Sequence, residues 1–397
     1  MQISDFTVPF PGEMVPLPGG LQAFVPDPLP QALDLPPRLL IQANEAERAI
    51  GRLGGLLVGG GNPLSPHLVA RPLQQREAIE SSRIEGTFTT PEQLVLFEAD
   101  GDDETETSQH ADIREVQNYS VALEWALAQL DALPVSARLI RHIHERLLRG
   151  VRGGEQQPGE FRNVQNFIGS SQDPHQARFV PPPPERVPEL ITDLERYIHT
   201  EPEQRSLVRL ARLALVHYQF ETIHPFRDGN GRVGRILIPL LLKTDDPADP
   251  PLYLSAFFEQ RRRDYYDLML AVSQRGAFAD WIEFFLTAIH QSAQDAVDLA
   301  GRLFRMRTAY RAHAREQKWP GACLVLIDAL FERPLLTIKR VEELTNVSTP
   351  TASSHLKKLS DAGIVKEFTG RQRNRKYLAL DLLRAIHSRP EDGAKGR

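Results

Sequence analysis

The strongest apolar pattern in the chain lies in residues 207–218, "LVRLARLALVHY". Apolar residues recur there at helical spacing, and further apolar residues fill most of the positions between them. A helix that is apolar nearly all round is buried. After a short polar break, "RVGRILIPLLLK" predicts a second buried helix at 231–243. The two helices indicate the centre of a helical domain.

The same spacing predicts helices over most of the remaining chain. They are expected from Pro37 onward with an interruption at "GGLLVGGGNPLSP", and then at about 110–130, at 135–149, in "ERVPELITDLERYIHT" and across 257–315. Two short β-like runs, "NVQNFIG" and "ARFV", enclose a polar turn and predict a small hairpin at 166–180. Residues 1–37 are rich in proline without a helical period, which predicts an extended strap. The fold class is mainly α.

An acidic stretch, "EADGDDETETSQ" at 98–109, marks the first expected boundary. The domain organisation predicted from such shifts in pattern has four parts. They are an N-terminal strap and helical region at 1–105, a core at 106–290, a linking helix at 291–315 and a small domain at 316–397.

Composition and charge narrow the class of protein. One cysteine, Cys323, excludes an internal disulfide and fits a reducing cytoplasm. The N-terminus lacks the pattern of a signal peptide, and the apolar run at 236–242 is too short for a membrane span, so no membrane association is expected. The net charge is −5, yet residues 333–397 carry 14 Lys and Arg against 7 Asp and Glu. A basic tail on an acidic body suggests a module that faces nucleic acid, or an ordinary solvated surface.

The polar break between the two buried helices reads "HPFRDGNGRVGR", residues 224–235, and its chemistry points to phosphate. Gly229, Asn230 and Gly231 allow a tight turn whose N–H groups meet the start of the next helix, which is a ready anion site. Arg232 and Arg235 share one face of that helix. Two cations at a helix N-terminus favour a bound anion.

Two further residues of this loop suit catalysis. Asp228 fits a Mg²⁺ ligand, because Mg²⁺ takes one or two carboxylates together with phosphate oxygens and water. His224 precedes a proline and is therefore pushed out of helical geometry into the loop. A neutral imidazole there is suited to removing a proton from a hydroxyl near pH 7.

The stretch "SSRIEGT", residues 81–87, contains a glutamate, Glu85, where the end of a helix is expected. Gly86 follows the helical pattern as a typical helix stop. Glu85 is thus expected in the last turn of a helix, where the dipole is negative and prefers Lys or Arg. A nearby cation would explain the position.

The loop matches the motif H-P-F-x-(D/E)-G-N-G-R-x-x-R without departure, and the chain therefore resembles the Fic family. "PGEFR", "RFVPPPPERVPEL", "PLYLSAFFEQRRRDYYDLM" and the C-terminal module extend the resemblance to most of the chain. It implies a Fic-type helical core with a hairpin flap, and transfer of AMP from ATP to a Tyr, Thr or Ser hydroxyl of a target protein.

The resemblance also implies a role for each residue of the motif. His224 is the base and Asp228 holds Mg²⁺ on the α- and β-phosphates. The turn at 229–231 forms the anion hole, and the ATP-binding set extends through Arg232, Val233, Gly234 and Arg235. Asp267, in "YYD", is placed by the adenine or ribose, with plain helix packing of that segment as the alternative. The target protein would bind along the flap by strand addition.

The stretch "SSRIEG" fits the family's inhibitory motif (S/T)-x-x-x-E-(G/N), represented here by Ser81, Glu85 and Gly86. The implied cation is Arg235. Glu85 would then take the place of the γ-phosphate and allow ATP to bind only in a non-productive pose.

The basic tail has the pattern of a winged helix-turn-helix, with helices "IKRVEELT" and "TPTASSHLKKLSDAG". A following hairpin carries Arg371, Arg373, Arg375 and Lys376 near its tip. In such modules the second helix enters the major groove and the wing contacts phosphates. Docking to protein, including a second copy of the chain as a homodimer, is the other role open to it.

Two classes of function follow from these patterns. The first is an autoinhibited protein adenylyltransferase. The second is a DNA-binding regulator whose Fic core senses nucleotide. Within the first class, removal of AMP by the same site or transfer of another phosphate-containing group stays open.

Overall fold

The computed structural model describes residues 1, 3–58, 67–100, 108–151, 154–169, 171, 173–370 and 373–388. The chain divides into two compact units, each assembled from three separate segments. The first unit consists of Met1–Gly51, Glu80–Thr87 and Arg114–Ala293. The second consists of Arg52–Ile79, Phe88–Ile113 and Gln294–Arg397. The boundaries of the four parts expected from the sequence stay predictions.

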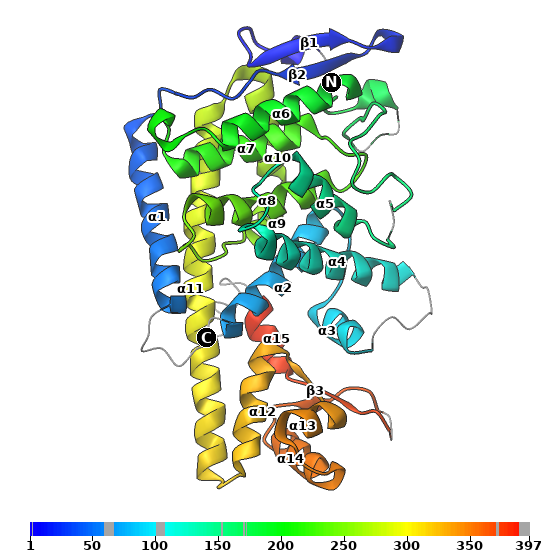
Figure 1. The fold of residues 1–397 in the computed structure, drawn as a ribbon, viewed down its shortest axis with the longest axis vertical. Helices are drawn as coiled ribbons and strands as arrows, with labels where there is room; N and C mark the ends of the chain where they lie inside the picture. Colours follow the sequence, from blue (N-terminus) through cyan, green and yellow to red (C-terminus); the bar gives the residue numbers. More distant parts are fainter. Residues whose placement is uncertain are drawn as a thin grey trace. The chain divides into compact units, whose positions relative to one another are not determined.

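The fold is mainly helical, as the apolar spacing predicted (Figure 1). The helices are α1 (Pro37–Val58), α2 (His67–Ile84), α3 (Pro91–Asp100), α4 (Ser108–Gln129), α5 (Ala137–Leu147), α6 (Val187–Ile198), α7 (Arg209–Ile223), α8 (Asn230–Asp245), α9 (Ser255–Gln260), α10 (Arg262–Arg275), α11 (Phe278–Glu316), α12 (Gly321–Glu332), α13 (Ile338–Thr345), α14 (Thr349–Asp361) and α15 (Leu380–His387). The strands are β1 (Gly12–Pro16), β2 (Gln22–Pro26), β3 (Leu335–Thr337), β4 (Lys366–Glu367) and β5 (Lys376–Leu378).

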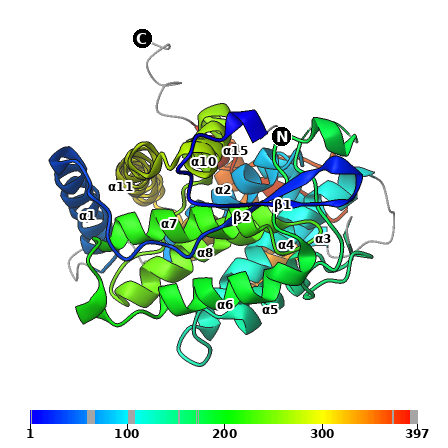
Figure 2. The same ribbon diagram turned by 90° about the horizontal axis from the view of Figure 1, so that it is seen from above.

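Helices α7 and α8 form the centre of the first unit. They pack against each other, α6 packs on α7, and α5 packs on α8 (Figure 2). Almost every residue of α7 from Leu210 to Ile223 is buried, and so is α8 from Arg232 to Leu242. This confirms the two buried helices expected from their all-round apolar pattern.

Two breaks differ from the sequence prediction. Helix α1 runs through Gly54 and Gly55 to Val58, so it includes the first five residues of the stretch that was expected to interrupt it. The helical stretch at 257–315 is divided into α9, α10 and α11, and α10 ends where Gly276 takes a left-handed conformation at φ 66°. That conformation is inexpensive only for a residue without a side chain.

The N-terminal region is not an extended strap. Strands β1 and β2 form an antiparallel hairpin in which Glu13 pairs with Val25 and Val15 with Ala23. Phe24 is fully buried, and its ring lies 5.8 Å from that of Phe179. The prolines obscure the alternation of apolar and polar residues in this part of the sequence. Packing of the aromatic rings stabilises the hairpin in spite of the prolines.

The predicted flap hairpin is present but short. Ile168 and Phe179 form one antiparallel bridge, in which the N–H of each donates to the carbonyl of the other at 2.9 and 3.0 Å. On its other side, Val180 accepts a hydrogen bond from the Phe24 N–H of β2 at 2.9 Å. The second flap segment is thereby held between Ile168 and the N-terminal hairpin.

The C-terminal part of the second unit has the winged helix-turn-helix arrangement that the sequence predicted. Helices α12, α13 and α14 pack together, and β3, β5 and β4 form a three-stranded sheet in that order. Thr337 caps α13 by accepting from the Arg340 N–H, and Asn346 ends it in the left-handed region. Among the described residues, no helix is both long and apolar enough for a membrane crossing.

Candidate active site

The loop between α7 and α8 is closed by its own asparagine. Asn230 accepts a hydrogen bond from the Phe226 N–H and donates one to the Phe226 carbonyl, both at 2.8 Å. Gly229 lies in the left-handed region at φ 75° and begins α8. The side chain of Asn230 therefore shapes the turn. The first backbone N–H groups of α8 lack partners inside the helix, which makes this end of the helix suited to an anion.

Two buried side chains that sequence analysis did not single out hold this loop in place. Arg162 donates to the carbonyls of His224 at 2.8 Å and Pro182 at 2.6 Å. His144 stacks on Phe226 with 3.8 Å between ring centres, accepts the Gly159 N–H at 2.9 Å and contacts the Asp228 carbonyl at 3.0 Å. The only sequence signal was the "PGEFR" stretch, which contains Arg162 and Gly159.

The position and the neutral state of the His224 ring suit a group that accepts a proton. It ends α7 in the left-handed region at φ 51°, and its Nδ1 lies 3.3 Å from the Glu221 carbonyl. If Nδ1 carries the hydrogen, Nε2 keeps its lone pair. Burial, aided by the charge of Arg162, lowers the pKa of His224 to about 4, so the ring is neutral at pH 7.

Asp228 is half-exposed beside the first turn of α8, as a metal ligand on a phosphate would be. Its Oδ1 accepts the Gly229 N–H at 2.6 Å and lies 3.6 Å from Arg232. The described residues contain no cluster of three His, Cys, Asp or Glu side chains. A single carboxylate such as that of Asp228 fits Mg²⁺, because Mg²⁺ accepts phosphate oxygens and water as its other ligands.

Arg235, almost fully buried, is in contact with the last turns of α2 and with the residue that follows the helix. It donates to the Ser81 hydroxyl at 2.8 Å, to the Ser81 carbonyl at 3.0 Å and to Glu85 Oε1 at 2.6 Å. Helix α2 ends at Ile84, one residue earlier than expected, and Gly86 takes φ 88° directly after Glu85. Burial alone would raise the pKa of Glu85, but Arg235 outweighs it, and the pKa lies below its ordinary value.

The Glu85 carboxylate also lies against the N-terminal turn of α8. A Cβ on Gly231 would lie 2.2 Å from Glu85 Oε1, so the carboxylate occupies space that only a glycine leaves open. An anion at a helix N-terminus is favoured by the dipole and by the unpaired N–H groups. The Glu85 carboxylate thus follows the C-terminal end of α2, which is unfavourable for an anion, but lies at the N-terminal end of α8, which is favourable.

Arg232 has a different environment from Arg235. Its guanidinium forms a buried ion pair with Glu115 of α4 at 3.2 Å. The hydroxyl of Thr87, two residues beyond Glu85, donates to the same carboxylate oxygen at 2.8 Å. Glu115 was not found from the sequence, because nothing local distinguishes it from other helix carboxylates. It connects Arg232 with the segment that carries Glu85.

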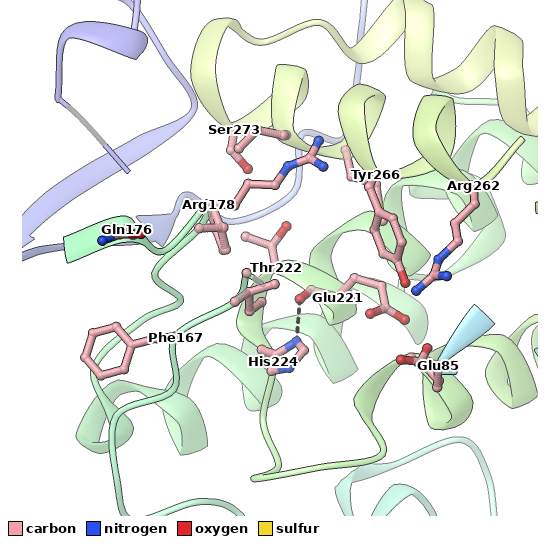
Figure 3. A pocket seen from close by; sticks show the side chains of 16 residues that line it. Glu85, Phe167, Gln176, Arg178, Glu221, Thr222, His224, Arg262, Tyr266 and Ser273 are labelled. Atoms are coloured by element: carbon pink, nitrogen blue, oxygen red, sulfur yellow. Dashed lines mark hydrogen bonds between the residues drawn. The ribbon is translucent and has the colours of Figure 1, made fainter. Parts of the chain in front are cut away.

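A cavity of about 620 Å³ opens beside the loop (Figure 3). Of the predicted site residues, Glu85, His224 and Gly231 line it. The side chains of Arg178 and Gln176 from the flap and of Tyr266 and Arg262 from α10 also face it. Seven of the eight predicted ATP-binding residues do not belong to its lining as it stands, namely Gly229, Asn230, Arg232, Val233, Gly234, Arg235 and Asp267. Arg235 reaches the cavity only through Glu85.

The segment "YYD" at 265–267 serves three purposes. Tyr265 is fully buried and contacts His217 at 2.7 Å, which is the helix-packing alternative. Tyr266 lines the cavity. Asp267 forms ion pairs with Arg178 of the flap and with Arg263, and it lies outside the lining. Contact of Asp267 with ribose or adenine stays a prediction.

The residues predicted to contact nucleic acid differ in their exposure. Arg373 and Arg375 are exposed in the wing, whereas Lys376 is buried at 7% exposure in β5, opposite Thr337. The inclusion of Lys376 among solvent-facing contacts was therefore wrong, because alternation along the strand turns it inward. Arg371 lies outside the described residues.

Known protein families match both the helical core and the C-terminal helix-turn-helix module. Residues 134–242 match the Fic/DOC family, residues 40–128 match the N-terminal region of the Fic/DOC family, and residues 324–367 match the bacterial regulatory proteins of the arsR family. The fold and the loop define a Fic-fold protein with a helix-turn-helix module. The chain belongs to the Fic family.

Curated relatives include proteins named protein adenylyltransferase Fic. That of Drosophila grimshawi is 30% identical over 171 residues, which cover 43% of this chain and 32% of the relative. That of Culex quinquefasciatus is 32% identical over 151 residues, covering 38% and 27%. The chain thus spans about a third of the length of these relatives.

Solved structures share the fold. A Fic family protein from Desulfovibrio desulfuricans G20 has a TM-score of 0.55 and 24% identity, with 88% of this chain and 98% of that chain covered. Fic-1 from C. elegans has a TM-score of 0.52 and 20% identity, with 69% and 75% covered.

Proposed function

We propose that this chain is a protein adenylyltransferase that transfers AMP from ATP to a hydroxyl of a target protein and is inhibited by its own Glu85. The observation that carries the proposal is the loop at 224–231, where a neutral imidazole and the N-terminal turn of α8 line one cavity and a half-exposed carboxylate lies on the same loop. The names of the curated relatives support the same activity.

The proposed reaction is an in-line displacement at the α-phosphorus. The target oxygen bonds to phosphorus while its proton passes to Nε2 of His224. The bond from phosphorus to the oxygen that bridges to the β-phosphate breaks, and pyrophosphate leaves. Positioning and neutralisation of charge contribute most to such chemistry.

The residues of the loop would divide this work. The N-terminal turn of α8 would hold phosphate oxygens through its N–H groups, with Arg235 alongside. Asp228 would hold Mg²⁺, which when bound neutralises phosphate charge. The flap would align the target backbone by strand addition along its exposed segment near Ile168.

Inhibition by Glu85 is proposed from the same geometry. Its carboxylate lies where an anion is favoured, and it engages Arg235, which a terminal phosphate would need. A γ-phosphate and the Glu85 carboxylate would repel each other at this distance from Arg235. Release of the segment at 85–87 would then open the site.

The test is self-modification of the full chain with labelled ATP. Glu85→Gly should label strongly and wild type faintly, because a few kcal/mol suffice to shift such an equilibrium from about 1:99 toward the competent state. The double variant Glu85→Gly, His224→Ala should not label, since loss of a general base typically costs about 10²–10⁴ in rate. Equal labelling of wild type and Glu85→Gly would contradict inhibition by Glu85. Undiminished labelling of the double variant would contradict the role of His224 as the general base.

A second candidate function, binding of DNA, is favoured by the match of residues 324–367 to the arsR family. The exposed Arg373 and Arg375 of the wing are the proposed phosphate contacts. Changing Arg371, Arg373 and Arg375 together to Ala should weaken binding of duplex DNA and flatten its log–log salt dependence by about 0.9 per lost contact. Arg384→Ala, an exposed change on α15, is the control. Absence of binding at low salt with any duplex would leave protein docking as the role of this module.

A further inference from the structure

Glu221 has a buried carboxyl oxygen for which the described residues offer no partner. It lies one turn before His224 on α7, and its side chain lines the cavity (Figure 3). Its Oε1 is inaccessible to solvent and makes no hydrogen bond with the described residues. A solvent-inaccessible carboxylate oxygen without a partner is costly, so this environment favours the neutral acid, whose hydroxyl is then available to a ligand in the cavity.

The position of this carboxyl is built into α8. A Cβ on Gly234 would lie 2.2 Å from Glu221 Oε1, just as one on Gly231 would lie 2.2 Å from Glu85 Oε1. Gly231 and Gly234 are three residues apart and share one face of the helix. The two carboxyls therefore occupy neighbouring sites on the same face of α8, with Arg235 close to both.

The two carboxyls differ in what they can do when a nucleotide arrives. Glu85 follows the last turn of α2, is about one-third exposed and can leave with its segment. Glu221 belongs to the central buried helix and cannot leave. A carboxylate that stays beside an incoming triphosphate would repel it, whereas a neutral acid would offer a hydrogen-bond donor.

We infer that the Glu221 carboxyl, in its neutral form, is a nucleotide-contacting group that donates a hydrogen bond to a phosphate oxygen. The inference rests on the proposed function, because it assumes that this cavity takes ATP. It predicts that an ionised Glu221 excludes the nucleotide. ATP affinity should therefore depend on the protonation of this one residue.

The surroundings agree with a neutral acid at pH 7. Burial raises the pKa of Glu221 to about 8. The positive charge of Arg235 lowers this pKa, and the negative charge of Glu85 raises it further. Burial keeps Tyr265 and Tyr266 protonated and His224 neutral, so none of them titrates between pH 7 and 9. The charged and titratable groups around the cavity are Glu85 after α2, His224 on α7, Arg235 on α8, Tyr265, Tyr266 and Arg262 on α10, and Arg178 on the flap.

The experiment measures the Kd of Mg·ATP for the full chain between pH 7 and pH 9. The terminal phosphate titrates near pH 6, so the charge of the ligand is constant over this range. Wild type should bind about tenfold more weakly at pH 9 than at pH 7. Glu221→Gln keeps the shape and a donor but has no titratable proton, so its Kd should be nearly the same at both pH values.

Glu85→Gln is the matched control. It should keep the pH dependence of wild type with a lower midpoint, because the charge that opposes ionisation of Glu221 is gone. Calorimetry in two buffers of different ionisation enthalpy gives a readout without any variant. At pH 8.5, wild type should take up most of one proton for each ATP bound.

Binding of ATP without proton uptake, or with the same pH dependence in wild type and Glu221→Gln, would overturn this inference and leave the proposed function intact. Failure of wild type and Glu85→Gly to bind ATP at every pH would overturn both.

Discussion

At the scale of single residues, neighbours in the loop have separate tasks. Asn230 closes the turn through both ends of its amide, and His144 and Arg162 hold the backbone from outside. His224 is thereby held at the wall of the cavity, and Asp228 is held half-exposed on the same turn. Preorganised groups of this kind need little rearrangement when a substrate binds.

Asp228→Asn tests the metal assignment at this scale. The amide oxygen can still accept the Gly229 N–H, so the turn should survive, while the charge that attracts Mg²⁺ is lost. In a Glu85→Gly background, the Mg²⁺ concentration for half-maximal self-modification should rise by about tenfold or more, since even changes around a metal ligand cost 10–100-fold in affinity. The measurement is a titration of labelling with Mg²⁺. An unchanged half-saturation point would exclude Asp228 as the ligand.

At the scale of elements, the segment at 85–87 is held at both ends. Glu85 contacts Arg235 of α8, and Thr87 donates to Glu115 of α4, which also pairs with Arg232. The segment that would inhibit the site is thus anchored beside both arginines. Loss of either contact should weaken its hold.

Thr87→Val should therefore activate the enzyme without any change to Glu85. A hydrogen bond to a charged group contributes about 1.5–3 kcal/mol, which is enough to release the segment in part. Self-modification should exceed that of wild type about tenfold and stay below that of Glu85→Gly. The matched control is Thr89→Val, since the buried Thr89 hydroxyl has no hydrogen-bond partner among the described residues. Activation by both variants alike would show that general loosening, and not the Thr87 contact, is responsible.

At the scale of the whole molecule, buried histidines make stability depend on pH. Burial lowers the pKa of His144 and His224 to about 4 and that of His217 to about 3. The unfolded chain, with values near 6.5, binds more protons than the folded protein below that pH, so stability falls as the pH drops. Glu221, whose pKa is raised, works in the opposite direction and offsets about one histidine.

The expected result is a loss of about 3 kcal/mol between pH 6.5 and 5, seen as a melting temperature lower by several degrees. His217→Gln should flatten this dependence, because an amide can replace the contacts to Tyr265 and Gly234 without titrating. His175→Gln, at an exposed position, should leave it unchanged. A melting temperature that is constant over this range in wild type would contradict the prediction.

Features whose cause lies within a few residues could be predicted from the sequence. The spacing of apolar residues specified α7 and α8, the Gly-Asn-Gly turn specified the start of α8, and Thr337 and Asn346 marked the limits of α13. Each depends on periodicity, on backbone freedom or on a cap within a few residues. The loop motif could be found for the same reason, since its residues are consecutive.

The packing of distant segments determines which side chains meet across long separations in the chain. It joins Arg232 to Glu115, turns Asp267 toward the flap, places Lys376 inside the wing sheet and leaves Glu221 Oε1 without a hydrogen-bond partner among the described residues. It also paired the proline-rich N-terminal strands. The physical reason is that burial and charge pairing depend on which surfaces pack together, and no window of the sequence contains that information.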